Sequence, residues 1–121
     1  AFVGPSLGSK TKIELIHKSF TTPAALHEAG VKVSIITDHP VIPLQYLPMC
    51  AALAANAGLD REEAWKAITI NAAQSTGIGD RVGSLEAGKD GDVVIWTADP
   101  METVGAESAL TIVDGKIVYQ Q

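Results

Sequence analysis

The sequence predicts an α/β fold for residues 1–78 and an all-β tail for residues 79–121. A short, almost continuously β-branched run at residues 31–37 is typical of a strand buried on both faces of a parallel sheet. Segments rich in Ala and bounded by Gly, before and after this run, indicate helices. Closely spaced glycines between residues 79 and 91 then break the chain into turns, and β-branched runs follow them.

The first helix is predicted to begin at Thr22 as its N-cap, with Pro23 at the first helical position. Gly30 supplies the left-handed residue that ends this helix. The strand over residues 31–37 follows directly and ends at Asp38. A helix followed at once by a buried strand is the arrangement that parallel sheets need.

Three further helices are predicted from their first and last residues. Asp60, with Glu63 three positions later, forms an arrangement like a capping box ahead of an apolar face. Asn71 is predicted to cap a short helix that Gly77 ends. The three helices are expected over residues 49–57, after Asp60, and over residues 72–75.

Three strands are predicted in the tail. Residues 92–96 form the first strand, which Asp99-Pro100 ends. Residues 110–113 and 116–119 form a hairpin around Asp114-Gly115, a dipeptide that favours a type I′ turn.

Composition narrows the class of protein. The 121 residues carry 9 Lys plus Arg against 14 Asp plus Glu, a net charge of −5, which argues against a nucleic-acid partner. The single Cys excludes a disulfide framework within the chain, and the longest apolar run, residues 49–55, is too short to span a membrane. These features predict a soluble cytoplasmic protein without a membrane partner. The apolar start at residues 1–3 favours a segment of a larger protein.

Asp38 is the first candidate for chemistry. A carboxylate at the carboxyl end of a buried parallel strand lies where α/β folds place ligands and catalytic groups. His39 adds a titratable ring beside it. Asp38 is therefore a candidate metal ligand or general base, and the alternative is an Asp that caps the turn after the strand.

The remaining chemically versatile side chains favour structural roles. His27 lies near the end of its helix, where a cation is favoured, and His17 is interpreted as a partly exposed residue. Cys50 is interpreted as a small buried thiol because no base is placed near it. Trp65 and Trp96 are interpreted as core anchors.

Several segments together resemble the metal-dependent amidohydrolase superfamily. Within it, they resemble the imidazolonepropionase-like branch most. VSIITDHP at residues 33–40 is similar to the eighth barrel strand with its terminal Asp, and ITINAA at residues 68–73 is similar to the Thr-x-Asn-Pro-Ala segment. GSLEAGKDGDVV at residues 83–94 is similar to the glycine-containing signature before the last strands, and VDGKIV at residues 113–118 to the closing hairpin. Ala72 replaces the usual Pro, and Gly91 the usual Ala.

The resemblance implies a (β/α)8 TIM barrel and a small composite β-sandwich built from both chain ends. Residues 1–78 would then be the last βα units, with strands seven and eight, and residues 79–121 the C-terminal strands of the sandwich. A complete barrel needs about 250 residues. A chain of 121 residues is therefore expected to be the C-terminal portion of a larger enzyme.

The resemblance also implies roles for two residues. Asp38 matches the strand-eight aspartate, which binds the divalent metal and takes the proton from the attacking water. His39 is a candidate for orienting the substrate or this carboxylate. The metal is expected to be zinc, with its other ligands upstream, because the family's His-x-His, bridging Lys and later His residues have no counterparts here.

The predicted function is hydrolysis of a C–N bond in a small-molecule substrate: a cyclic amide, an amidine or a dipeptide-like compound. The expected partners are the missing N-terminal part of the same protein and, as an option, further copies in a homo-oligomer. The isolated chain is expected to be inactive. Two alternatives stay open: a non-catalytic assembly module with this fold, and an independent small α+β binding domain. The presence of Asp38 favours the enzyme.

Overall fold

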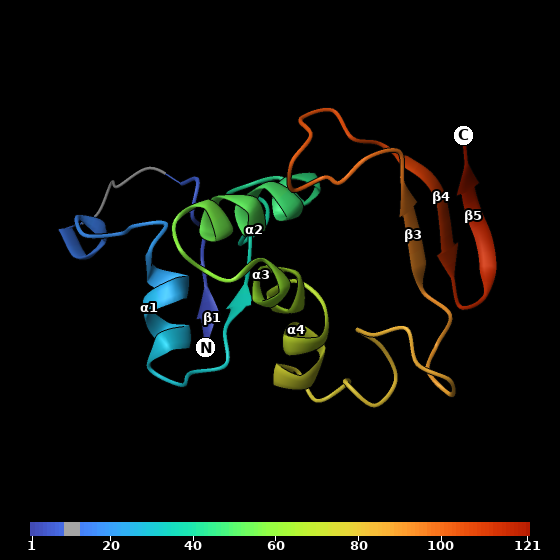
Figure 1. The fold of residues 1–121 in the computed structure, drawn as a ribbon, viewed down its shortest axis with the longest axis horizontal. Helices are drawn as coiled ribbons and strands as arrows, with labels where there is room; N and C mark the ends of the chain where they lie inside the picture. Colours follow the sequence, from blue (N-terminus) through green and yellow to red (C-terminus); the bar gives the residue numbers. More distant parts are fainter. Residues whose placement is uncertain (9–12) are drawn as a thin grey trace.

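The structure, a computed structural model, describes residues 1–8 and 13–121. Helices α1–α4 lie around two short strands, β1 and β2, and a three-stranded sheet of β3, β4 and β5 lies at the other end of the molecule (Figure 1). The chain is thus a mixed α/β fold, and its helices all precede the three-stranded sheet.

The first sheet consists of β1, Phe2–Val3, and β2, Ser34–Ile35, which pair in parallel with Phe2 opposite Ser34. Residues 33–35 are only 0–3% exposed, so the predicted burial is confirmed. The predicted strand length, residues 31–37, is wrong, because β2 has two residues. Pairing with a partner sets the length of a ladder, and β1 offers only two residues.

Four helices cover this sheet, and none of those described is long and apolar enough to cross a membrane. Proline stands in the first turn of both α1 and α2. Gly30 follows α1 with a φ of 79°, which confirms the predicted left-handed stop. The N-cap of α1 is Thr21, one residue before the predicted Thr22. The helices are α1 Thr22–Glu28, α2 Leu47–Asn56, α3 Arg61–Ala67 and α4 Ile70–Ser75, with 3-10 turns at Ile13–Leu15 and Leu44–Tyr46.

Capping explains the start of α3 but not that of α4. The Asp60 side chain accepts a hydrogen bond from the Glu63 backbone N–H at 3.1 Å, so the predicted cap is confirmed. The predicted cap at Asn71 is wrong, because α4 begins earlier and Thr69 is its N-cap. Asn71 lies inside the helix with its side chain buried, which makes it available for a tertiary contact instead.

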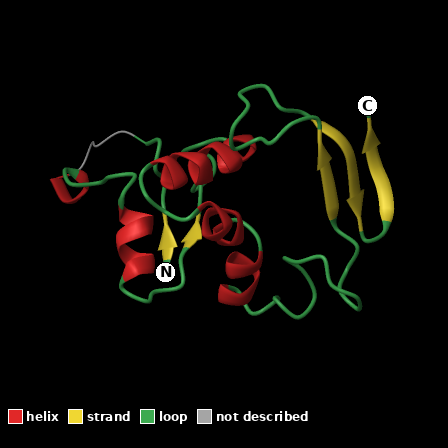
Figure 2. Cartoon of the chain, in the orientation of Figure 1, coloured by secondary structure: helices red, strands yellow, loops and turns green. Residues whose placement is uncertain are grey.

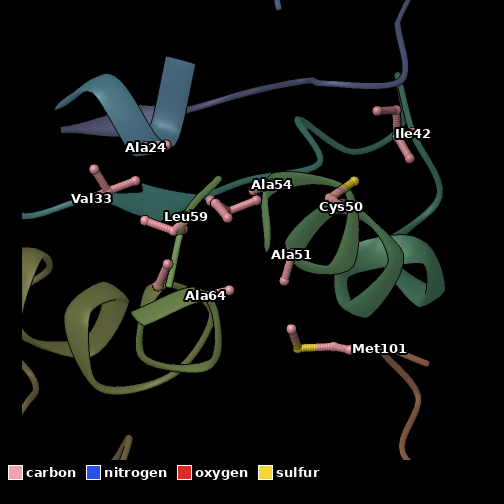
Figure 3. Close-up of a cluster of buried hydrophobic side chains, with 11 residues drawn as sticks. Ala24, Val33, Ile42, Cys50, Ala51, Ala54, Leu59, Ala64 and Met101 are labelled. Atoms are coloured by element: carbon pink, nitrogen blue, oxygen red, sulfur yellow. The ribbon is translucent and has the colours of Figure 1, made fainter. Parts of the chain in front are cut away.

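The core is formed largely by small side chains at the contact between α2 and α3. Ala51 and Ala64 are fully buried there, and Cys50, also fully buried, points toward Ile42 on another side of α2 (Figure 3). Met101 belongs to the same cluster although it comes from the loop between β3 and β4. We call that loop, residues 97–107, the strap. Small side chains let two helices approach closely, and the longer Met side chain fills space beside them.

An ion-pair group fixes the strap on the outside of α3. The Arg61 guanidinium pairs with Asp99, and it also contacts Glu102 at 3.0 Å. The Asp99 carboxylate accepts a further hydrogen bond from the Met101 backbone N–H at 2.8 Å. The strap therefore contacts the helical part both through Met101 and through charged side chains.

The second sheet is an antiparallel meander of β3, Val93–Trp96, β4, Ser108–Val113, and β5, Lys116–Gln120 (Figure 2). Asp114 and Gly115 join the last two strands with φ of 50° and 71°, so the predicted type I′ turn is confirmed. Every residue of β5 is exposed.

Candidate active site

Asp38 lies just beyond the carboxyl end of β2, where the chain leaves the buried sheet. Thr37 is 4% exposed, whereas Asp38 and the three residues after it are exposed. Asp38 has a φ of 54°, in the left-handed region, which Asp and Asn tolerate better than other residues with a Cβ atom. The abrupt change of direction places the carboxylate at the surface, at the end of a strand whose own residues are buried.

A tight turn holds Asp38 and His39 in place. The Val41 backbone N–H donates to the Asp38 carbonyl at 2.8 Å, and the peptide bond between His39 and Pro40 is cis. A four-residue turn with a cis proline at its third position is a type VI turn. Because Asp38 and His39 occupy its first two positions and both are exposed, the structure brings the two predicted site residues together on one turn.

The end of β1 lies beside this turn. A Cβ atom added to Gly4 would lie 2.1 Å from the Ile36 carbonyl oxygen, so the two backbones approach as closely as only glycine allows. Beyond Gly4, the Lys18 ammonium donates to the carbonyls of Pro5 and Gly8 at 2.7 and 2.6 Å. The segments after both parallel strands therefore leave the sheet at the same end, the carboxyl end of the strands. Parallel α/β folds place their sites at this end.

Asp38 is one candidate metal ligand rather than a complete site. Among residues 1–8 and 13–121, no group of three or more His, Cys, Asp or Glu side chains could hold a metal ion. Catalytic metal sites use about three protein ligands. The exposed Asp38 carboxylate fits a cation as a single oxygen ligand, and the described residues do not complete a set of three around it.

The two other histidines and the cysteine have different surroundings. His17 is exposed after the first 3-10 turn, and His27 of α1 lies 3.9 Å from a carboxylate oxygen of Glu63. Cys50 is fully buried in the core, which raises the pKa of its thiol and confirms the structural interpretation.

The two tryptophans face a cavity between the helices and the second sheet. The cavity has a volume of about 800 Å3, its lining is mostly apolar, and it includes Trp65 of α3 and Trp96 of β3. Trp65 packs against the core, as predicted, whereas Trp96 is outside the core cluster. Asp38 and His39 do not line this cavity.

Asn71 is the residue whose contact the sequence interpretation missed. Its side-chain amide donates to the Val33 carbonyl of the chain entering β2, at 3.1 Å. The one signal in the sequence is a polar side chain in an Ala-rich helix. The same residue type is common at helix starts, so the sequence pattern predicts a cap at this position rather than a tertiary contact.

The chain belongs to the amidohydrolase family, whose model matches residues 10–118. A crystal structure of an amidohydrolase from Thermotoga maritima is 38% identical with a TM-score of 0.94, over 99% of this chain and 31% of that one. An imidazolonepropionase from Bacillus velezensis is 41% identical over 59% of this chain and 18% of its own length. An N-substituted formamide deformylase from Arthrobacter pascens is 32% identical over 78% of this chain and 20% of its own length.

These comparisons confirm the family that the motifs indicated. They also show that the chain spans about a fifth of the length of these two curated relatives. The Thermotoga maritima protein reproduces the fold over almost the whole chain, including both sheets, and it continues well beyond it.

Proposed function

We propose that this chain is the C-terminal part of a metal-dependent hydrolase that cleaves a C–N bond in a small-molecule substrate such as a cyclic amide, an amidine or a dipeptide-like compound. Family membership supports hydrolysis, and relatives of the chain hydrolyse C–N bonds. The observation that carries the proposal is the position of Asp38: exposed, at the carboxyl end of a buried parallel strand, on a turn fixed by a backbone hydrogen bond.

In this proposal the Asp38 carboxylate is one ligand of a divalent cation, with zinc as our choice. Such a cation, when bound, makes a water molecule more acidic and polarises the substrate carbon–nitrogen group. Asp38 accepts the proton of the attacking water on a carboxylate oxygen and gives it to the leaving nitrogen. His39, on the same turn, orients the substrate or the carboxylate.

We further propose that residues 1–78 are the last units of a (β/α)8 barrel and residues 79–121 the C-terminal strands of a β-sandwich. The parallel pairing of β1 with β2 supports the first assignment, since parallel strands belong to sheets covered on both faces. The exposed edge of β5 supports the second. The acidic composition and single Cys support a cytoplasmic location.

The same strands count against the independent binding domain. A two-stranded parallel sheet of two residues per strand has two open edges and little ladder to stabilise it. An isolated module of this kind needs more strands than the described chain supplies. The non-catalytic module differs from the enzyme in having no turnover, so turnover by the full-length wild-type protein separates the two, and a substitution then tests the role of Asp38.

The test is Asp38→Asn in the full-length protein. We expect kcat to fall about 10²–10⁴-fold, the usual contribution of a general acid–base group. Stability should change by about 0.5 kcal/mol or less, because the side chain is exposed and Asn tolerates a left-handed φ.

Asp114→Asn is the matched control, because Asp114 is also exposed and has a φ of 50°. It should leave kcat unchanged. Wild-type turnover by Asp38→Asn would remove Asp38 from the mechanism and favour a different site, whereas no turnover by the wild-type full-length protein would favour the non-catalytic module.

A further inference from the structure

One peptide unit at the start of β2 is hydrogen-bonded on both sides. Its N–H, that of Ser34, donates to the Ala1 carbonyl next to β1 at 2.8 Å. Its carbonyl, that of Val33, accepts from the Asn71 amide of α4 at 3.1 Å. Because the two groups of a trans peptide unit point in opposite directions, Asn71 binds the edge of β2 that faces away from β1.

The Asn71 contact differs from its two neighbours between α4 and β2. The Lys32 ammonium donates to the Gln74 side chain at 2.6 Å, but this pair is exposed. The hydroxyls of Ser34 and Ser75 lie 3.3 Å apart and join two side chains only. Only the Asn71 bond, among these three, is both buried and made to the strand backbone, so its loss leaves a buried carbonyl without that donor.

The segment after Val33 leads directly to Asp38 and is largely buried. Val33, Ser34, Ile35 and Thr37 are all less than 5% exposed, so the segment is enclosed by neighbouring side chains. The five steps along the chain from Val33 to Asp38 span at most about 17 Å at the usual rise of an extended strand. A second bond, from the Ile36 N–H to the Val3 carbonyl at 3.0 Å, holds the same segment further along.

We propose that Asn71 is a positioning residue for Asp38: its buried amide holds the Val33 carbonyl and thereby fixes the strand at whose end the catalytic carboxylate lies. The inference rests on the proposed function, since it gives Asn71 a role through Asp38. Asn71 contacts neither substrate nor reacting atoms in this scheme. It sets the position of the strand, and a small displacement of a catalytic group is enough to slow a reaction greatly.

The experiment compares Asn71→Leu with Ser75→Ala in the full-length protein. Leu has a similar volume and no donor, whereas Ser75→Ala removes a contact from the same helix to the same strand and leaves the backbone bond intact. For Asn71→Leu we expect kcat to fall at least tenfold with KM within threefold of wild type. Ser75→Ala should leave kcat within twofold.

Hydrogen exchange gives a readout that does not depend on catalysis. Peptides covering residues 33–38 should exchange at least tenfold faster in Asn71→Leu and within twofold of wild type in Ser75→Ala. If Asn71→Leu does not accumulate as folded protein, Asn71→Ser replaces it, because its hydroxyl is too short to reach the Val33 carbonyl. The same losses are expected for Asn71→Ser.

The outcomes separate this inference from the proposed function. Wild-type kcat and wild-type exchange in folded Asn71 variants, with turnover abolished in Asp38→Asn, would overturn the role of Asn71 alone. A kcat lost equally in Ser75→Ala would also overturn it, because the effect would then belong to the helix contact in general. If Asp38→Asn keeps its turnover, the proposed function fails, and the positioning of a catalytic Asp38 fails with it even if exchange is faster.

Discussion

The two sheets of this molecule are built in opposite ways. β2 has two residues, both buried, and is enclosed by helices. β5 has five residues, all exposed, and Ile117 and Val118 in it are about 60% exposed. In the first sheet, packing and a side-chain amide stabilise strands that have almost no ladder. In the second, backbone hydrogen bonds and a favourable turn hold strands that bury little. Local pairing and core packing can therefore each organise strands without the other.

The largest expected effect is the loss of activity when residues 1–121 are separated from the rest of the protein. We expect the isolated 121-residue chain to show no metal-dependent amide hydrolysis, because the described residues supply one candidate ligand and no three-residue ligand group. The measurement is turnover of an imide or amide substrate with added zinc, with the full-length protein as the positive control. Turnover by the isolated chain that a chelator abolishes would contradict the proposed division of the active site.

A larger side chain should lower the free energy of unfolding more in the helical core than in the exposed strand β5. Ala64 is fully buried between helices, so we expect Ala64→Leu to lower the free energy of unfolding by about 1–3 kcal/mol. Val118→Leu, on the exposed β5, is the control and should change it by about 0.5 kcal/mol or less. Denaturant unfolding of the full-length protein measures both. Equal effects would show that β5 is as tightly covered there as the helical core.

The smallest expected effect concerns the strap, the loop of the second sheet that packs against the helices. The Met101 backbone N–H, and after it the Arg61 guanidinium, hold the pKa of Asp99 below its usual value. A lowered pKa in the folded state means that Asp99 contributes stability above the usual pKa of Asp, about 4, and that this contribution is lost as the pH falls through the lowered value. Because the groups are partly exposed, the Arg61 pair contributes about 0.2–1 kcal/mol.

We therefore expect Asp99→Asn to melt a little below wild type at pH 7 and to approach the wild-type Tm as the pH falls below 4. Thermal unfolding of the full-length proteins across this range is the measurement. Asp90→Asn, which removes an exposed pair with Arg81 outside the strap, serves as the control for general charge effects. A Tm difference that grows on acidification would give the wrong sign and contradict the role of the carboxylate.

The features predicted correctly are those that a few adjacent residues determine. The Asp60 cap, the stop at Gly30 and the turn at Asp114 each depend on local backbone chemistry. The length of β2 and the role of Asn71 depend on which element lies opposite, which local patterns do not contain. The same applies to Met101, whose place in the core requires the strap to fold back over α2.

In the candidate site, too, the sequence pattern predicts some features and not others. Asp38 at the end of a buried strand follows from the sequence pattern, and the structure places it there. The type VI turn does not follow from the pattern, because a proline alone does not say which isomer precedes it.

The position of Met101 has a consequence for dividing this chain by engineering. A cut at residue 78 would look natural from the sequence, yet it would remove a side chain that is 93% enclosed within the core of the preceding helices. A graft that exchanges the last strands for those of a relative must therefore supply an apolar side chain at this point of the strap, together with an acidic partner for Arg61. The helices and the strap should therefore be kept together in such a graft, and the three-stranded sheet is the part that is more readily exchanged.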